Sequence, residues 1–178
     1  MKKIKKALIS VSDKKNLKKL LKILAKNKIE IISSGGTYKE IKKLKFKCLE
    51  ISDYTGSPEI LGGRVKTLHP KIHAGILSKR NNKSHKNDMN NNKFEEIHLV
   101  VVNFYPFEKT LEQTHNHLKI IENIDVGGPT MVRAAAKNYN DVAVITSSNQ
   151  YNELIDEMEK NKGSTSLDFR EKLSLEAF

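Results

Sequence analysis

The sequence predicts an α/β protein with a doubly wound, mostly parallel sheet. Short apolar segments alternate along the chain with segments whose apolar residues recur every three to four positions, and this alternation indicates strands connected by helices. Residues 98–103 (HLVVVN) are apolar at nearly every position, which is typical of a strand in the middle of a parallel sheet. A length of 178 residues suits a single core that needs no disulfide or metal to be stable.

The first half of the chain shows this alternation clearly. Leucines from Leu17 to Leu24 recur at i, i+3, i+4 and i+7, the spacing of a helix packed on a sheet, and Ser12 or Asp13 is its predicted N-cap. The predicted elements are a strand at Lys6–Val11, that helix, a strand at Glu30–Ser33, a helix from Gly35 to about Leu44 and a strand at Lys47–Ser52. Residues 53–78 show no clear periodicity, and the polar residues 79–93 predict a mobile surface loop.

The second half continues the same pattern. Pro129 stands where the first turn of a helix tolerates a missing N–H, and apolar residues from Tyr151 to Met158 again follow helical spacing. The predicted elements are a strand at His98–Asn103, helices at about 107–117 and from Gly127 to Asn138, a strand at Asp141–Thr146, and helices starting near Tyr151 and spanning Leu167–Phe178. We expect residues 1–162 to form one domain and residues 163–178 to begin the connection to another.

Composition limits the compartment that we expect. The single cysteine, Cys48, excludes an intrachain disulfide and a cysteine-based metal site, and it fits a reducing compartment. The basic N-terminus is followed by an apolar run that is too short for export, and no stretch approaches the roughly 18 apolar residues of a membrane span. We therefore expect a cytoplasmic protein with no membrane partner.

The formal charge of +11 is carried mainly by lysine. Of the 32 basic residues only four are Arg, the residue on which nucleic-acid readers depend for bidentate and stacking contacts. Residues 1–47 hold a net charge of +13, and most of their lysines lie on the outward faces of predicted helices. We therefore expect no nucleic-acid partner, and a positive field that attracts small anionic molecules.

Polar clusters follow the first two predicted strands, at the edge where open α/β sheets bind ligands. Residues 10–14 (SVSDK) follow the first strand, and residues 33–37 (SSGGT) follow the second. The two glycines let the backbone approach an anion, the next helix start supplies free N–H groups, and Lys14 adds a full charge. These residues are compatible with two interpretations, an ordinary strand-to-helix turn and a phosphate-binding pocket. They match neither a Walker loop nor a dinucleotide-binding fingerprint.

Two histidines in residues 62–75 (GGRVKTLHPKIHAG) stand four positions apart, a spacing that metal sites use. Pro70 lies between His69 and His73, and no Glu accompanies them as it does in helical zinc motifs. We therefore expect no metal here.

Two later segments hold further candidate side chains. Residues 103–107 (NFYPF) end the apolar strand, and residues 125–130 (DVGGPT) open a helix. Taken alone, Tyr105 is interpreted as a rim aromatic and Asp125 as a helix N-cap.

Together these segments resemble one protein family. The segments ALISVSDK, SSGGT, LGGRVKTLHPKIHAGIL, LVVVNFYPFE and IENIDVGGPTMVRAAAKN occur in this order between Ala7 and Asn138. They are similar to the N-terminal domain of the bifunctional purine-biosynthesis proteins that join phosphoribosylaminoimidazolecarboxamide formyltransferase to IMP cyclohydrolase. That domain has a methylglyoxal-synthase-like fold, in agreement with the doubly wound sheet. The tail FREKLSLEAF resembles the entry to the formyltransferase domain, which this sequence lacks, so we expect a fragment or a truncated gene product.

The resemblance implies an enzyme that closes the second purine ring. The carboxamide nitrogen of the 5-formamidoimidazole-4-carboxamide ribonucleotide attacks the formyl carbon, and water leaves to give IMP. This step implies no cofactor, and 10-formyltetrahydrofolate is implied only for the missing domain. The implied partner is the ribonucleotide substrate, and the implied assembly is a homodimer, although much of the family's interface involves the absent domain.

The resemblance also implies roles for residues of this chain. Lys66 and Tyr105 would stand at the formyl oxygen, where a cation and a phenol stabilise negative charge. Asp125 and Lys137 would address the carboxamide, as proton acceptor and as orienting partner. The implied substrate-binding residues are Arg64, Thr67 and Asn103 for base and ribose, the N–H groups of Val126 and Gly127 for the oxyanion, and Ser10, Ser12, Lys14, Ser34, Gly35, Gly36 and Thr37 for the 5′-phosphate.

Two alternatives use the same fold. A methylglyoxal synthase needs catalytic aspartates after a Gly-Gly and before a Pro, and this chain has Arg64 and Tyr105 at those positions, so the required base is lacking. A non-catalytic nucleotide- or phosphate-binding regulatory module needs the glycine turn but has no use for the four implied catalytic residues. Their joint presence favours an enzyme.

Overall fold

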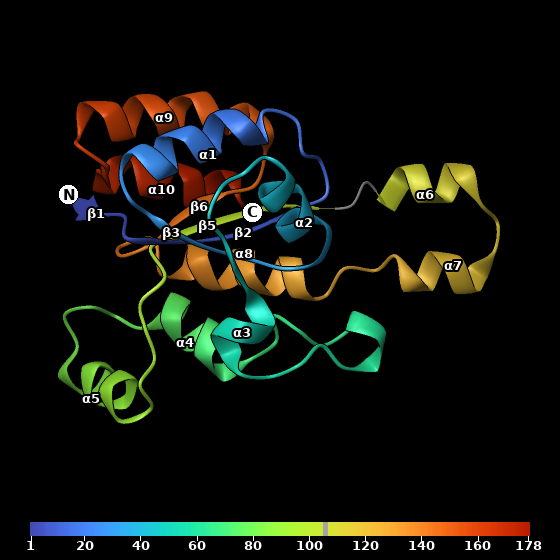
Figure 1. The fold of residues 1–178 in the computed structure, drawn as a ribbon, viewed down its shortest axis with the longest axis horizontal. Helices are drawn as coiled ribbons and strands as arrows, with labels where there is room; N and C mark the ends of the chain where they lie inside the picture. The colour runs from blue at the N-terminus through green and yellow to red at the C-terminus, as the bar shows by residue number, and fades with distance from the viewer. Residues whose placement is uncertain (105–106) are drawn as a thin grey trace.

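The structure is a computed structural model that describes residues 1–104 and 107–178. Within these residues, five strands form a parallel sheet in the order β4-β3-β2-β5-β6 (Figure 1). Their bounds are Lys6–Val11 (β2), Glu30–Ser33 (β3), Leu49–Glu50 (β4), Leu99–Asn103 (β5) and Ala143–Ile145 (β6). The α/β class with a doubly wound parallel sheet is confirmed.

Helices cover both faces of this sheet. On one face α1 (Leu17–Lys26) packs beside α9 (Tyr151–Lys160), and on the other α8 (Gly127–Lys137) packs beside α4 (Pro70–Leu77) (Figure 1). The other elements are α2 (Gly35–Lys43), α3 (Ile51–Thr55), α5 (Lys83–Asn91), α6 (Phe107–Gln113), α7 (His117–Glu122), α10 (Leu167–Glu176), the 3-10 turns η1 (Leu61–Gly63) and η2 (Ser148–Gln150), and an antiparallel pair of β1 (Lys2–Lys3) with β7 (Ser164–Thr165).

The core lies between the sheet and these helices. The central strands β2 and β5 are buried along nearly their whole length, as expected for strands that are covered on both faces. On α1 the predicted leucine stripe is buried against the sheet, because its 3.6-residue period turns one face inward. Among the described residues, no helix is both long enough and apolar enough to cross a bilayer.

Two local predictions in the first half are wrong. The strand expected at Lys47–Ser52 has only the two residues of β4, because the chain turns into α3 at the buried Ile51. The polar residues 79–93 contain a helix, α5, instead of an irregular loop. Asn82 caps α5 by accepting a hydrogen bond from the His85 N–H, and the buried side chain of Met89 anchors the helix to the body.

The start of α1 also differs from the prediction. Asn16, in a left-handed conformation with φ 60°, precedes the helix, and its side chain makes no capping hydrogen bond. Neither Ser12 nor Asp13 is the N-cap. The Asp13 carboxylate instead accepts from the Lys15 N–H at 2.9 Å, within the turn that follows β2.

The C-terminal segment 163–178 packs on the same core as the rest of the chain. Strand β7 pairs with β1, and α10 contacts β6 and α8. Leu173 is fully buried, and Arg170 is 2 % exposed. That this segment leads to a further domain stays a prediction.

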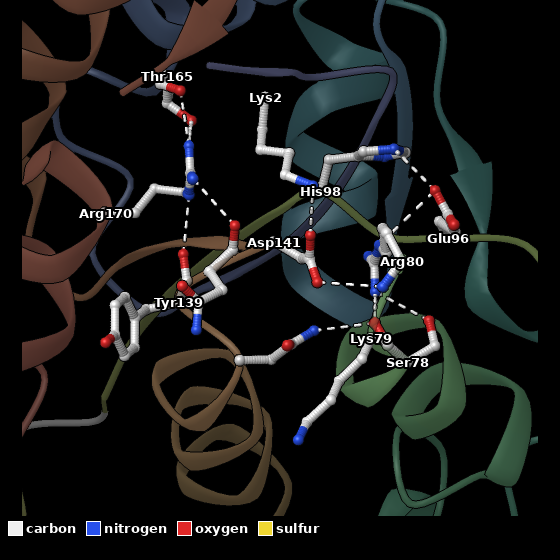
Figure 2. Close-up of polar contacts among 12 residues, drawn as sticks. Lys2, Ser78, Lys79, Arg80, Glu96, His98, Tyr139, Asp141, Thr165 and Arg170 are labelled. Carbon is white, nitrogen blue, oxygen red and sulfur yellow. Dashed lines mark hydrogen bonds and ion pairs between the residues drawn. The ribbon is translucent and has the colours of Figure 1, made fainter. Parts of the chain in front are cut away.

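A buried polar network fixes the edge of the sheet next to β6 (Figure 2). The Asp141 carboxylate pairs with Lys2 Nζ at 2.6 Å and accepts from the Arg80 N–H at 3.1 Å. The Arg80 guanidinium donates to Ile97 O at 2.7 Å, and the Arg170 guanidinium donates to the carbonyls that lead into β6. Buried carbonyl oxygens need hydrogen-bond donors. The two arginines supply these donors to loop carbonyls that lie outside the backbone hydrogen bonds of β6, and they thereby fix the loops in place.

His98 lies beside this network and predicts a pH dependence of stability (Figure 2). Burial, reinforced by the positive charges of Arg80, Lys5 and Lys6, lowers the pKa of His98 from 6.5 to about 4. The unfolded chain therefore binds more protons than the folded one between these two values. The stability contributed by neutral His98 is complete above about pH 6.5 and is lost as the pH falls toward 4, which amounts to about 3 kcal/mol.

The wild type is expected to lose free energy of unfolding between pH 7 and 4.5 as His98 takes up a proton. We expect His98→Gln to abolish most of this decrease, because glutamine does not titrate. Urea denaturation at both pH values measures the free energy of unfolding. His115→Gln, which changes an exposed histidine, serves as the control and keeps the wild-type pH dependence. An unaltered pH dependence in His98→Gln would assign the acid sensitivity to other groups.

Candidate functional site

A cavity of about 640 Å³ opens at the carboxyl ends of β2 and β5. These two strands are neighbours, but the chain proceeds outward from them in opposite directions, to β3 and β4 on one side and to β6 on the other. Parallel sheets bind ligands at such a switch point, because the connecting loops separate there and leave a crevice. The location of the cavity therefore follows from the strand order.

The turn after β3 forms one end of the cavity. Gly35, at φ +53°, allows the chain to pass from β3 directly into α2, whose first N–H groups are open toward the cavity. The Thr37 hydroxyl donates to Val11 O at 2.9 Å and accepts from the Val11 N–H at 3.0 Å. The Ser33 hydroxyl donates to Ile9 O at 2.7 Å. The start of α2 is thus tied to the end of β2.

Two lysines lie over this glycine turn. A Cβ placed on Gly35 would lie 3.7 Å from Lys66 Nζ, and a Cβ placed on Gly36 would lie 4.0 Å from Lys14 Nζ. Two ammonium groups and a helix N-terminus therefore converge on one small volume. Such an arrangement stabilises a phosphate or another anion, because the helix dipole and both charges have the same sign.

Asn103, the last residue of β5, orders the adjacent loop. Its Oδ1 accepts hydrogen bonds from the Ser12 N–H at 2.7 Å, the Ser12 hydroxyl at 3.0 Å and the Asp13 N–H at 3.0 Å. Its Nδ2 donates to Asp13 O at 2.9 Å. One side-chain amide thus satisfies the backbone of the turn that carries Ser12 and Lys14.

The start of α8 forms the other end of the cavity. The Asp125 carboxylate accepts from the Gly128 N–H at 3.0 Å, so it pairs one of the free N–H groups at the helix start. The N-cap itself is Val126, so the prediction that Asp125 is the N-cap is wrong by one residue. Thr67 packs against this turn, since a Cβ on Gly127 would lie 2.4 Å from Thr67 Oγ1. Thr67 is thus at the α8 end while the neighbouring Lys66 reaches the glycine turn, and the two residues together span the cavity.

Most of the residues expected at the site line this one cavity. They are Ser10, Ser12, Lys14, Ser34, Gly35, Gly36, Thr37, Arg64, Lys66, Thr67, Asn103, Asp125, Val126 and Gly127. Lys137 is not among them: it is exposed at the last turn of α8, and an eleven-residue helix places it about 15 Å from the start of that helix. Tyr105 lies outside the described residues.

Two carboxylates that the sequence analysis did not single out pair with cations of the site. Glu59 Oε1 lies 3.9 Å from Lys66 Nζ, and the Glu122 carboxylate binds the Arg64 guanidinium. The hydrogen bond to Glu122 raises the pKa of Arg64 above its usual range. The pair of Glu59 with Lys66 could have been predicted from the sequence, because a turn at Gly62-Gly63 brings residues 59 and 66 opposite each other. The pair of Glu122 with Arg64 joins distant segments and has no such signal in the sequence.

Among the described residues, no group of three His, Cys, Asp or Glu side chains lies close enough together to hold a metal ion. The His69 ring accepts from the Lys71 N–H at 3.1 Å and contacts the Ser57 hydroxyl at 3.2 Å. The His69 ring thus caps the start of α4. Burial lowers the pKa of His73.

Comparison with known proteins places this geometry in a family. The model of the MGS-like domain matches residues 16–130, which is more than half of the chain. The chain belongs to the MGS-like domain family. A second model, described as the AICARFT/IMPCHase bienzyme, matches residues 135–178. The match of the first model includes β5 and two of the cations that line the crevice, Arg64 and Lys66, while β2 and Lys14 precede it.

Individual relatives extend over nearly the whole chain. The bifunctional purine biosynthesis protein PurH of Prochlorococcus marinus subsp. pastoris is 51 % identical over 97 % of this chain, and PurH of Bradyrhizobium diazoefficiens is 46 % identical over 98 %. The chain spans 33 % of the length of each of these relatives. A crystal structure of ForH superimposes with a TM-score of 0.86 at 30 % identity, covering 98 % of this chain and 92 % of that one. The expected resemblance and the methylglyoxal-synthase-like fold are thereby confirmed.

The four hydrogen bonds of Asn103 predict its contribution to stability. Asn103→Leu leaves the N–H groups of Ser12 and Asp13 without their acceptor, and we expect it to lower the free energy of unfolding by about 2 kcal/mol. Asn103→Asp keeps the acceptor oxygen for both N–H groups but replaces the donor to Asp13 O by a charged oxygen, and we expect its effect to be smaller because the two N–H groups stay paired. Urea denaturation of the three proteins measures the difference. Equal losses in both variants would contradict the role assigned to Oδ1.

Proposed function

We propose that this chain is an IMP cyclohydrolase, which closes the 5-formamidoimidazole-4-carboxamide ribonucleotide to IMP with loss of water. One observation carries the proposal: a single cavity holds an anion-binding turn at one end and Asp125 with a helix N-terminus at the other. An intramolecular ring closure on a nucleotide needs both ends of the cavity. One end must hold the phosphate, and the other must polarise the reacting groups of the base. The PurH relatives are named as purine biosynthesis proteins, and the second family model is described as the AICARFT/IMPCHase bienzyme, which supports this chemistry.

The 5′-phosphate is assigned to the glycine turn. The N–H groups at the start of α2, the Ser10 and Ser34 hydroxyls, and Lys14 supply donors and charge there. The Ser12 hydroxyl is assigned to the same phosphate, and it joins when it turns away from Asn103 Oδ1. Arg64, Thr67 and Asn103 are assigned to the ribose and base. The Asn103 amide is already hydrogen-bonded to Ser12 and Asp13. Asn103 therefore acts on the ligand indirectly, by ordering the loop that carries these two residues.

The ring closure is assigned to the α8 end of the cavity. Substrate binding supplies proximity, since the attacking nitrogen and the formyl carbon belong to one molecule. Asp125 accepts the carboxamide proton, and the N–H groups of Val126 and Gly127 face the developing oxyanion. Lys66 stabilises the same oxyanion when its flexible stem swings from the glycine turn. The oxygen takes up the carboxamide proton and leaves as water with the formamido N–H proton, as that nitrogen forms the C=N bond of the new ring. The roles of Tyr105 and Lys137 rest on the resemblance alone.

The proposal includes the conditions of the reaction. The step requires no cofactor or metal, and 10-formyltetrahydrofolate belongs to the formyltransferase portion of the longer relatives. The substrate is a small ribonucleotide in the cytoplasm, with no nucleic acid or membrane as partner, and the proposed assembly is a homodimer.

A non-catalytic nucleotide-binding module is the alternative function. The two lysines at the glycine turn favour it as much as they favour an enzyme, because both functions hold a phosphate. Asp125 and the α8 N-terminus at the opposite end of the cavity favour the enzyme.

We expect the purified chain to convert the formamido-carboxamide ribonucleotide to IMP without folate or metal. The appearance of IMP is measured by ultraviolet absorbance. Lys66→Ala is expected to lower kcat about 10²- to 10³-fold, because it removes a charge at the oxyanion, while IMP still binds. Lys79→Ala, which changes an exposed lysine on another segment, is the control and keeps wild-type turnover. IMP binding without turnover would support the binding module, and failure to bind IMP would contradict both functions.

A further inference from the structure

The ion pair between Arg64 and Glu122 bridges two walls of the cavity. Arg64 follows the 3-10 turn η1, and Glu122 is the last residue of α7. Arg64 Nε donates to Glu122 Oε2 at 3.3 Å, and Arg64 Nη2 donates to Oε1, so the guanidinium meets the carboxylate with two nitrogens. Both residues line the cavity. The pair therefore joins two segments that are distant in sequence at the opening where a ligand enters.

Helices α6 and α7 form an arm, residues 107–122, that projects from the body of the protein (Figure 1). The residues that follow the arm, 123–126, complete the cavity wall and lead into α8. Asn123, directly after the arm, donates from its side-chain amide to Lys119 O at 2.8 Å. Among the side chains that the structure describes, Arg64 with Glu122 is the one ion pair or hydrogen bond between the arm and a segment that is distant in sequence. The position of the arm therefore depends on a contact at its inner end.

The Arg64 side chain needs such a partner to hold one orientation. Its loop is closed by the Ile60–Val65 bridge and carries three consecutive residues with positive φ, Leu61, Gly62 and Gly63, so the backbone is fixed. The side chain itself is 63 % exposed and otherwise free to sample many rotamers. A carboxylate that binds two nitrogens along one edge of the guanidinium favours a single rotamer.

We propose that Glu122 is a positioning residue, which holds the Arg64 guanidinium at the cavity and thereby fixes the inner end of the α6–α7 arm to the cavity wall. Glu122 acts on the ligand through Arg64, and it contributes no group to the reaction. The part of this proposal that concerns substrate affinity rests on the proposed function. The part that concerns the arm does not, because it describes the protein without ligand.

Amide hydrogen exchange of the ligand-free protein tests the arm. We expect Glu122→Gln to raise exchange in residues 107–122 about two- to fivefold, as for the loss of an exposed ion pair, and to leave the sheet unchanged. Glu112→Gln, on the exposed face of α6, removes the same charge from the same arm and is expected to have no effect. Equal exchange in the wild type and Glu122→Gln overturns the proposal, whether or not the protein makes IMP.

Steady-state kinetics and IMP titration test the effect on Arg64. We expect Glu122→Gln to raise KM and weaken IMP binding about threefold to tenfold while kcat stays within twofold. The charge-swapped double variant Arg64→Glu with Glu122→Arg restores arm protection and does not restore IMP affinity. Recovery of affinity by the swap would overturn the assignment of Arg64 to the ligand. Absence of turnover in the wild type, with the exchange result as expected, would contradict the proposed function and leave the arm contact in place.

Discussion

The parallel pairing of β2 with β5 is the constraint on which the rest of the site depends. The register sets Val11 opposite Asn103, so both strands end at the same level. From that level the Asn103 amide reaches the turn after β2, and the Thr37 hydroxyl closes the same turn from α2. A shift of the register by one residue would turn the Asn103 side chain to the other face of the sheet and leave several backbone groups unpaired. The cavity is therefore a product of strand register as much as of its lining side chains.

Charge gives the cavity its character. Lys14, Lys66 and Arg64 face it, and each is attached to a short, well-fixed segment. Without a ligand, like charges that converge in this way repel one another, and carboxylates from outside the cluster reduce that repulsion: Glu59 lies near Lys66 and Glu122 binds Arg64. The excess positive charge remains at the glycine turn, where the start of α2 adds its dipole. An incoming dianion thus meets a site whose cations are already in place.

Periodicity predicted the sheet and most of the helices, because β2, β3 and β5 are buried on both faces and α1 and α9 have one apolar stripe each. It failed where tertiary contacts decide the outcome. Helix α5 has one buried residue, Met89, which is too weak a signal among asparagines and lysines, and the left-handed Asn16 displaces the start of α1. At the site, motif resemblance indicated the lining residues from Ser10 to Gly127. It could not indicate the partner of Arg64, since Glu122 is brought near only by the fold.

The small ribbon of β1 and β7 joins segments from the two ends of the chain. Lys2 pairs with Thr165, and Lys2 also binds Asp141 beside β6. Closing so long a loop in an unfolded chain is entropically unfavourable, and it becomes favourable only when the intervening sheet has already brought the ends together. The ribbon therefore forms late in folding. During synthesis on a ribosome, residues 2–3 remain without their strand partner until residues 164–165 have followed them.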